Sequence, residues 1–509
     1  MIIRSRFPAV PIPDQTLPAF LLDRAAELGD APALVDGATG RVTSYAELDE
    51  SVHRAAAGFA AAGTARGDVV ALMAPNCPDW AVALLGAQAA GAAVTPINPL
   101  APPEQVLVQL QDSGARCLVT VPALLDRVGV AADKAGVTDL VVLGEAPGAR
   151  SFAELLDAER GRTVAGNPAD VALLPYSSGT TGLPKGVRLT HRSLVASCAQ
   201  TEPLFAYAPT DTTVAVLPWW HAAGFATQLV HPLHEGATTV TMPRFDLPEF
   251  LGLLTRHRVA KQIVVPPIVL ALAKHPAVDD ADLSALEVLG SGAAPLGAGL
   301  EQACAARLGC VVLQGYGMTE TGPMLAIAPL SGGHVRPPGS AGMLVAGTEA
   351  RLVDPISGQD AETGELWVRG AQVMAGYLNE PAATAATLDA EGWMRTGDLA
   401  TVDADGWVFL LDRVKELIKY KGHQVAPAAL EAVLITHPAV ADAAVVGVPD
   451  EEAGELPRAF VVRSGTVSEE ELIEYVADRV APQEKVRDVV FTDTVPRSPT
   501  GKVLRRLLK

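Results

Sequence analysis

The chain has 509 residues, of which 49% are hydrophobic and 5% aromatic, with 46 glycines and 39 prolines. This length exceeds that of a single core, and this composition is typical of globular rather than disordered chains, so we expect at least two domains with many turns. The formal net charge of −19 argues against nucleic acid as a partner, and it means that an anionic ligand must be held by locally placed cations.

Cysteine usage and hydropathy bear on where the protein works. The five cysteines include no Cys-x-x-Cys pair, which favours reduced thiols over disulfides or a metal site. The first 14 residues lack the long apolar core of a signal peptide. The uncharged run 80–100 is rich in alanine and is interrupted by glycine and proline, so we interpret it as a helix followed by a strand. We therefore expect a cytoplasmic protein with no membrane span. For its assembly we expect a monomer or homodimer.

Strands and helices alternate along the first third of the chain. Ser44 and Glu47 have the spacing of a capping box, which predicts a helix from there to about residue 62. The patterns beyond it predict strands at 69–73, 93–97 and 117–121 and helices at 80–90 and 103–111. Strands that alternate with helices indicate a parallel sheet with crossover helices.

The next stretch, 176–187, has the sequence YSSGTTGLPKGV and follows an apolar run at 171–174 that is typical of a buried strand. Its small residues let the backbone approach a ligand, its hydroxyl and N–H groups suit an oligophosphate, and Lys185 adds a positive charge. It is not a Walker A loop, because Lys185 lies between Pro184 and Gly186. Since α/β proteins bind ligands at loops after strands, we interpret 176–187 as a phosphate-binding loop; the alternative is a flexible surface loop.

The alternation then resumes, with strands expected at 213–217, 238–242, 262–265 and 311–313. The segment 314–323, QGYGMTETGP, offers an aromatic ring, a hydroxyl and a carboxylate in Tyr316, Thr319 and Glu320. A ring can stack on a base, and a carboxylate near phosphates usually binds Mg²⁺. The alternative is a glycine-rich turn with Tyr316 in the core. Short β-like runs between Gly and Asp turns at about 341–409 predict a small β-rich unit.

Beyond Arg413 the chain has the pattern of a separate small domain. Its expected elements are strands 443–448 and 459–462 and helices 427–435 and 468–480. Three short stretches beside or within it are turns that can also carry function: 396–398 (TGD), 419–424 and 496–502. The first is a plain turn or a ribose-binding carboxylate, and the last places Lys502 on a Pro/Gly turn. We expect the end, 503–509, to be a helix-like, solvated basic face.

Five of these stretches occur in a fixed order: YSSGTTGLPKG, GYGMTETGP, TGD, DRVKELIKYKGHQVAPAALE and PRSPTGK. In them the chain resembles the adenylate-forming acyl-CoA synthetases over essentially its whole length, and most closely the 4-coumarate:CoA ligase group. The resemblance implies an α/β fold. A large N-terminal domain (1–412) would hold doubly wound parallel sheets and a small β-barrel-like unit. A hinge (413–415) would join it to a small, mobile α+β C-terminal domain (416–509) that carries the catalytic lysine.

The activity implied by this resemblance is that of an ATP-dependent, AMP-forming acid–thiol ligase that uses ATP, Mg²⁺ and coenzyme A. A carboxylate attacks the α-phosphate of ATP to give acyl-AMP and pyrophosphate, and the thiol of CoA then displaces AMP. The first step brings an anion to a polyanion and needs cationic and phosphate-binding groups. For the second step the C-terminal domain swivels about its hinge. The alternatives are an adenylating enzyme that loads a carrier protein or oxidises the acyl group as luciferases do, and a non-catalytic binding protein on the same scaffold.

The resemblance also implies roles for individual residues. Those implied for ATP and AMP are Ser177, Ser178, Gly179, Thr180, Thr181 and Lys185 at the phosphates, Ala294, Gln314, Gly315 and Tyr316 at adenine, Thr319 at the α-phosphate, and Asp398 and Arg413 at the ribose. Those implied for catalysis are Lys502, Lys185, Thr319, Glu320 and His221, with Glu320 as the Mg²⁺ ligand. Those implied for CoA and domain movement are Arg244, Lys421 and Gly422 for CoA, Lys415 as the hinge, and Lys419 and Gln424 for the adenylation pose.

The acyl pocket is where the chain departs from the plant-type pattern. The implied lining is His221, Ala223, Phe225, Gly292, Gly317, Pro323 and Met324. His221 would lie at the carboxylate end, or else be a structural histidine. Ala223 takes the place of a tyrosine that meets the ring hydroxyl in hydroxycinnamate ligases, and Met324 the place of a usual valine. An apolar pocket of this kind favours cinnamate-like or medium-chain fatty acids over polar diacids.

Overall fold

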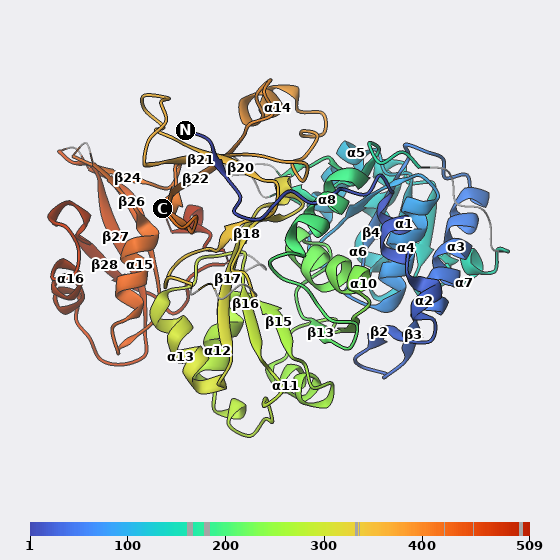
Figure 1. The fold of residues 1–509 in the computed structure, drawn as a ribbon, viewed down its shortest axis with the longest axis horizontal. Helices are drawn as coiled ribbons and strands as arrows, with labels where there is room; N and C mark the ends of the chain where they lie inside the picture. Colours follow the sequence, from blue (N-terminus) through green and yellow to red (C-terminus); the bar gives the residue numbers. More distant parts are fainter. Residues whose placement is uncertain are drawn as a thin grey trace.

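The computed structural model describes residues 1–159, 166–177, 184–330, 334, 336–421, 423–450, 452–497 and 502–508. Three parts follow one another along the chain (Figure 1). Two of them, an α/β part and a β-rich part, lie side by side, and the C-terminal part lies at the opposite side of the molecule from the first helices. Among the described residues no helix is both long and apolar enough to cross a bilayer.

The first parallel sheet is built around β4 (Val69–Met73), which pairs in parallel with β5 (Ala93–Pro96) and β6 (Cys117–Thr120). The order of its strands is β12-β9-β5-β4-β6-β7-β8. The others are β7 (Asp139–Val142), β8 (Arg150–Ser151), β9 (Val171–Leu173) and β12 (Leu189–Thr190). The crossover helices are α4 (Pro78–Ala89), α5 (Pro103–Ser113) and α6 (Leu125–Ala135), and α3 (Tyr45–Ala61) leads into β4. The predicted alternation is confirmed to within two residues at each end, and Ser44 and Glu47 form the predicted capping box.

Two further sheets each contain three neighbouring strands that pair in parallel. The first has the order β13-β14-β2-β3 and comprises β13 (Thr212–Ala215), β14 (Thr238–Thr241), β2 (Pro32–Asp36) and β3 (Val42–Ser44). The second comprises β15 (Lys261–Val264), β16 (Val288–Ser291), β17 (Val311–Gly317), β18 (Met324–Ile327) and β19 (Met343–Leu344). The helices of this region are α8 (His191–Thr201), α9 (Ala222–Phe225), a π-helical turn (Ala226–Val230), α10 (His231–Glu235), α11 (Leu247–Arg256), α12 (Pro266–Lys274) and α13 (Ala298–Leu308).

The strand predicted at 311–313 continues as β17 to Gly317, so the alternative of a glycine-rich turn directly after residue 313 is wrong. Strand β18 returns antiparallel beside this extension and pairs Tyr316 with Ala326. Residues 315–317 stay extended because their backbone N–H and C=O groups pair with a partner strand, although two glycines on their own would favour a turn. The extension sets Tyr316 on a rigid strand rather than on a loop.

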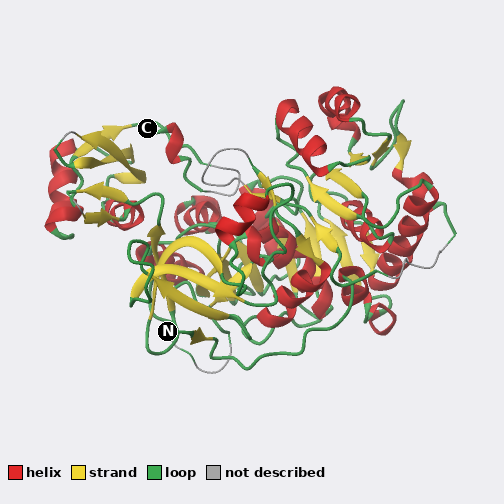
Figure 2. Ribbon diagram, turned by 90° about the horizontal axis from the view of Figure 1, so that it is seen from above, coloured by secondary structure: helices red, strands yellow, loops and turns green. Residues whose placement is uncertain are grey.

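The β-rich part is an antiparallel sheet with the order β1-β20-β21-β22-β23. Its strands are β1 (Ile3–Arg4), β20 (Glu349–Val353), β21 (Thr363–Arg369), β22 (Met394–Val402) and β23 (Val408–Arg413). The strands curve strongly around a core of their own (Figure 2). The plain-turn interpretation of 396–398 is wrong, since these residues lie inside β22 and Asp398 pairs with Arg413 of β23.

The C-terminal part has a separate hydrophobic core that includes Leu430, Val445 and Leu472. Its elements are β24 (Ile418–Tyr420), β25 (His423–Val425), α15 (Pro427–Ile435), β26 (Val440–Asp450), β27 (Gly454–Arg463), α16 (Glu469–Ala477) and β28 (Asp488–Phe491). The predicted helix at 503–509 is only a 3₁₀ turn, Arg505–Leu507. The prediction of a solvated basic face is wrong for Arg505, which pairs with Glu416 and Glu431.

Candidate active site

The phosphate-loop candidate is closed by a short antiparallel pair, β10 (Tyr176–Ser177) with β11 (Lys185–Gly186). This pairing sets Ser177 directly opposite Lys185 at the base of the loop. Four members of the predicted phosphate-binding set, Ser178, Gly179, Thr180 and Thr181, lie outside the described residues. Gly186 lets the strands pack closely here, because a Cβ atom would come within 3.1 Å of the Tyr176 ring and 3.2 Å of the Leu378 side chain, which is tighter than an ordinary contact.

Tyr377 connects this loop to the segment that carries Glu320. The hydroxyl of Tyr377 donates to Oε1 of Glu320 at 3.0 Å, and Nζ of Lys185 lies 5.3 Å from the centroid of the Tyr377 ring. The backbone holds this arrangement: the N–H of Leu378 donates to the carbonyl of Gly186 at 2.8 Å. The structure therefore brings Lys185 and Glu320 to the same site. Sequence reasoning missed Tyr377, which lies outside every recognised motif.

Thr319 and Glu320 lie in a 3₁₀ turn, Thr319–Thr321, directly after β17. The side chain of Glu320 is buried, with 8% of its surface exposed. No cluster of three or more metal-ligating side chains occurs in the described part of the chain. One carboxylate is nevertheless the donor set expected for a magnesium ion that is bound mainly by substrate phosphates and water. The residues present thus fit Mg²⁺ held jointly with ATP rather than by a protein cage.

Three side chains meet where strands β17, β22 and β23 come together. The hydroxyl of Tyr316 donates to Oδ2 of Asp398 at 2.6 Å, and Nε of Arg413 lies 3.0 Å from Oδ1 of the same carboxylate. Burial raises the pKa of Tyr316 well above its usual value, and the charge of Asp398 adds to this shift, so Tyr316 is a neutral donor. The arrangement fixes a buried carboxylate with one donor on each oxygen.

The loop after β16 forms the neighbouring wall. The Gln314 side chain accepts from the N–H of Leu296 and donates to its carbonyl, each at 3.1 Å, and it also donates to Glu301. This side chain therefore holds the 292–296 loop, and only the backbone of Gln314 and Gly315 is left for a ligand. Ala293 has a φ of 68°, a left-handed conformation that is uncommon for a non-glycine residue and concentrates at functional sites. The predicted adenine contact, Ala294, directly follows it.

Lys502 reaches this site from the C-terminal part. Burial, and then the nearby charge of Arg413, lowers the pKa of Lys502, whereas the carboxylates of Asp398 and Glu320 oppose that shift. Burial lowers the pKa of His221 to about 4, and the charge of Lys502 adds to the effect. Lys502 thus lies within electrostatic reach of all four of these residues. His221 is neutral at physiological pH and can accept or donate a hydrogen bond without carrying charge.

Arg505, three residues after Lys502, anchors the tail of the chain. Its guanidinium lies 2.8 Å from Glu416 and 2.6 Å from Glu431, and its Nε donates to the carbonyl of Val445 at 3.1 Å. Burial raises the pKa of Glu431, and the charge of Arg505 opposes this shift. Sequence reasoning missed this residue, because a terminal run of basic residues is usually solvated.

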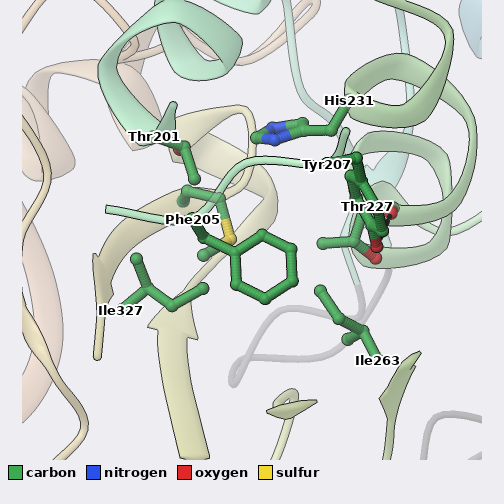
Figure 3. Close-up of a pocket in the computed structure, with 8 residues that line it drawn as sticks. Thr201, Phe205, Tyr207, Thr227, His231, Ile263 and Ile327 are labelled. Atoms are coloured by element: carbon green, nitrogen blue, oxygen red, sulfur yellow. Dashed lines mark hydrogen bonds between the residues drawn. The ribbon is translucent and has the colours of Figure 1, made fainter. Parts of the chain in front are cut away.

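The predicted lining of the acyl pocket stays a prediction, and the structure gives the surroundings of several of its residues. His221 caps α9 by accepting from the N–H of Ala223 at 3.3 Å. Gly317 lies so close to Pro323 that a Cβ atom would be 1.7 Å from its carbonyl oxygen, so no other residue fits there. Met324 lines a narrow cavity, drawn in Figure 3, that sequence reasoning did not find. Phe225 does not line it; this ring is 1% exposed and packs into the N-terminal core.

Four of the predicted CoA, hinge and adenylation-pose residues have described side chains, and these four lie on the surface. Arg244, Lys415 and Lys419 are exposed. Lys421 is exposed too, has a φ of 46°, and its Nζ lies 3.5 Å from Glu452. Gly422 lies outside the described residues, and Gln424 is placed only by its backbone in β25.

Comparisons with known proteins bear on what this site does. Residues 21–378 match the family model of the AMP-binding enzyme, and residues 429–502 match that of the AMP-binding enzyme C-terminal domain. A protein of Oryza sativa subsp. japonica, 4-coumarate–CoA ligase 3, is 43% identical over 100% of this chain and 94% of its own length. The 4-coumarate–CoA ligase of Pinus taeda is 42% identical over 100% of this chain and 97% of its own.

Solved structures are similar over nearly the whole chain. ATP-bound MatB from Rhodopseudomonas palustris has a TM-score of 0.89 at 29% identity, and the match covers 97% of this chain and 98% of the MatB chain. The anthranilate CoA ligase AuaEII in complex with anthranoyl-AMP has a TM-score of 0.90 at 26% identity, and the match covers 98% of this chain and 97% of the AuaEII chain.

Proposed function

The chain belongs to the AMP-binding enzyme family, and on this premise we propose how its residues carry out the reaction. It is an ATP-dependent, AMP-forming carboxylate:CoA ligase that activates an aryl acid through an acyl-AMP. The single observation that carries the proposal is the Lys185–Tyr377–Glu320 connection. It sets a phosphate-binding cation beside a carboxylate, and Lys502 lies within electrostatic reach of that carboxylate.

In the first half-reaction the chain's own groups hold a polyanion and direct a carboxylate toward it. Ser177 and Lys185, with the serine, glycine and threonine residues of the loop, bind the β- and γ-phosphates. The Asp398–Arg413 pair orients the ribose, and the Lys502 ammonium neutralises the carboxylate and the α-phosphate as they meet. Glu320 would hold Mg²⁺, which would supply neutralisation of the phosphate charge. His221, which is neutral, orients the acid by hydrogen bonding.

The second half-reaction needs a change of position of the C-terminal part. We propose that residues 416–509 form a mobile domain that turns about a hinge at 413–415, with residues 1–412 as the fixed part. Lys502 would leave the site, and Lys421 with Gly422 would enter to line the path of the pantetheine chain. Arg244 would hold the CoA phosphates. The separate hydrophobic core of the C-terminal part supports its movement as a unit.

We also propose that the enzyme works in the cytoplasm as a monomer or homodimer. Four of the five cysteines are buried thiols, and a reducing compartment suits a protein with such thiols. Gel filtration with light scattering measures the oligomeric state directly.

One assay tests the reaction. Pyrophosphate release is measured with a panel of aryl and fatty acids, with Mg²⁺ and with EDTA, and thioester formation is measured with free CoA and with a phosphopantetheinyl carrier protein. We expect both products from aryl acids, with free CoA and only in the presence of Mg²⁺. Pyrophosphate release with thioester appearing on the carrier alone would favour the alternative enzyme. An absence of pyrophosphate with every acid would contradict the proposal.

A further inference from the structure

The β-hairpin formed by β24 and β25 stands at one edge of the C-terminal sheet, next to β27 (Figure 1). Each of its strands is three residues long, and its tip carries Lys421, which the proposed function assigns to the path of CoA. Tyr420 pairs with Gly454 and so joins the hairpin to β27. Because a hairpin this short is only marginally stable on its own, contacts from the rest of the C-terminal part have to hold its shape.

The backbone of the hairpin tip is held by the first residues of β27 and the residue before them. The N–H of Lys419 donates to Oε2 of Glu455 at 2.8 Å, and the N–H of Lys421 donates to the carbonyl of Ala453 at 2.8 Å. Lys421 has a φ of 46°, a left-handed conformation that a non-glycine residue keeps only where its surroundings impose it. These bonds therefore fix the backbone at the tip.

The side chain of Tyr420 is held separately, by Arg487. The guanidinium carbon of Arg487 lies 5.0 Å from the centroid of the Tyr420 ring, and Nη2 of Arg487 donates to the Tyr420 hydroxyl at 3.3 Å. Nζ of Lys421 lies 6.0 Å from the same centroid. Tyr420 therefore links Arg487 to the lysine at the tip through two cation–π contacts.

Arg487 is itself fixed to the middle of the sheet. Its backbone N–H donates to the carbonyl of Pro457 in β27 at 2.9 Å, and its Nη2 also donates to the carbonyl of Pro482 at 2.8 Å. Strand β28 begins at the next residue, Asp488, and pairs with β27. Within the described residues the buried Nε of Arg487 has no hydrogen-bond partner. Since buried donors nearly always have one, the guanidinium is oriented by the Tyr420 ring rather than by the need to satisfy every donor.

The two lysines of the proposed mechanism thus have separate supports. The tail with Lys502 is anchored through Arg505 to two glutamates, Glu416 and Glu431. The hairpin tip with Lys421 is instead connected through the Tyr420 ring to Arg487. Because different side chains form the two supports, one of them can be weakened while the other stays intact.

We propose that Arg487 is a positioning residue for the second half-reaction: through Tyr420 it holds the β24–β25 hairpin in the shape that fits the pantetheine chain of CoA. The inference rests on the proposed change of position of the C-terminal part, and it gives Arg487 a task in the CoA step alone. A displacement of about 1 Å at a reacting centre can slow a reaction by about a hundredfold, so loss of this support should be visible in the rate.

The test measures the two half-reactions of the full-length protein separately. Adenylation is followed as single-turnover pyrophosphate release from ATP, Mg²⁺ and cinnamate, or whichever aryl acid the wild type activates fastest. The second step is followed as thioester formed from the supplied acyl-AMP and CoA. We expect Arg487→Met to lower kcat/KM for CoA by about tenfold and to leave adenylation within about twofold of wild type. Arg487→Lys keeps a cation near the ring and should recover part of the loss.

Arg463→Met is the matched control. The guanidinium carbon of Arg463 lies 4.3 Å from the centroid of the Phe491 ring, at the end of β27 remote from the hairpin. The variant therefore also removes a contact between an arginine and a ring from the C-terminal part, and it should leave both half-reactions unchanged. Arg505→Met should show the opposite division, with adenylation the more affected step.

Equal losses in both half-reactions for Arg487→Met, or an unchanged CoA step, would overturn the inference and leave the ligase function standing. A wild type that releases pyrophosphate but forms no thioester with free CoA would refute the proposed function and the inference with it. Should Arg487→Met not fold, Tyr420→Leu removes the same contact from the other side. It should also slow the CoA step by about tenfold, and an unchanged CoA step in this variant would overturn the inference.

Discussion

The hydroxyl of Tyr377 donates a 3.0 Å hydrogen bond to Oε1 of Glu320. Residues 57 positions apart in the sequence thereby share one contact, and Lys185 lies over the same ring. The contact holds Oε1 of Glu320, and we expect it to orient this carboxylate toward the cation that the proposed function assigns to it. Tyr377 is therefore a positioning residue.

Tyr377→Phe keeps the ring that faces Lys185 and removes only the hydrogen bond. A bond to a charged group is worth about 1.5–3 kcal/mol. We therefore expect kcat/KM for adenylation to fall by about tenfold to a hundredfold, with a higher Mg²⁺ concentration needed for half-maximal rate. Pyrophosphate release across a Mg²⁺ series measures both. Tyr45→Phe is the control, because it removes a buried tyrosine hydrogen bond to Ala237 elsewhere; an unchanged Mg²⁺ requirement in Tyr377→Phe would contradict the role.

Arg505→Met should weaken the first half-reaction by loosening the tail that carries Lys502. Loss of the guanidinium leaves the buried Glu431 without its counter-charge, a change that costs about 3–5 kcal/mol in comparable buried pairs. Adenylation should fall at least tenfold, with a smaller effect on thioester formation from supplied acyl-AMP. The exposed neighbour Arg506 offers the matched control, Arg506→Met. Equal losses in both half-reactions would show that Arg505 stabilises the fold without positioning Lys502.

Much of the fold follows from local pattern. The capping box at Ser44 and Glu47, and strands such as β4 and β6, are read correctly because hydrophobic periodicity and cap residues act over a few positions. The errors lie where a distant strand decides the local structure. A turn was the alternative interpretation for residues 315–317 and the default one for Asp398, but β18 and β23 pair with these residues and keep them extended.

The residues of the candidate site also fall into two groups: those that sequence motifs indicate, and those that only the three-dimensional structure places there. Lys185, Glu320 and Lys502 stand in sequence motifs and could be named from them. Tyr377 is brought to Lys185 by backbone pairing of the segments around 186 and 377, which no periodicity indicates.

Glu235→Gln should change how stability depends on pH. Burial raises the pKa of Glu235 to about 8, although the N–H of Tyr207 opposes the shift. Between its ordinary value of 4.5 and about 8, the folded protein holds a proton that the unfolded chain has lost. Stability therefore falls as pH rises through this window, by up to about 1.4 kcal/mol per pH unit, and then levels off.

Glutamine keeps an acceptor for the N–H of Tyr207 but does not titrate. The variant should therefore show a shallower loss of Tm between pH 5 and pH 8 than the wild type, and it should be the more stable protein at pH 8. Thermal unfolding at several pH values measures this. The exposed Glu362 provides the control, Glu362→Gln, which should follow the wild-type curve. Parallel curves for Glu235→Gln and the wild type would contradict the protonated state of Glu235.

Lys502→Ala should separate the two half-reactions. In this structure Lys502 lies within electrostatic reach of Glu320, Asp398 and Arg413, where its ammonium would neutralise the acid and the α-phosphate. Its loss removes a charge needed when two anions meet but not when a neutral thiol group attacks the acyl carbon. Adenylation should fall by about a hundredfold or more, because one preorganised electrostatic contact is worth about 10²–10³ in kcat.

Thioester formation from supplied acyl-AMP should stay within about threefold of wild type, since each half-reaction uses a different face of the C-terminal part. Arg506→Ala, in the same part and exposed, is the comparison and should leave both half-reactions unchanged. Comparable losses in both half-reactions for Lys502→Ala would refute the division of labour and, with it, the proposed change of position.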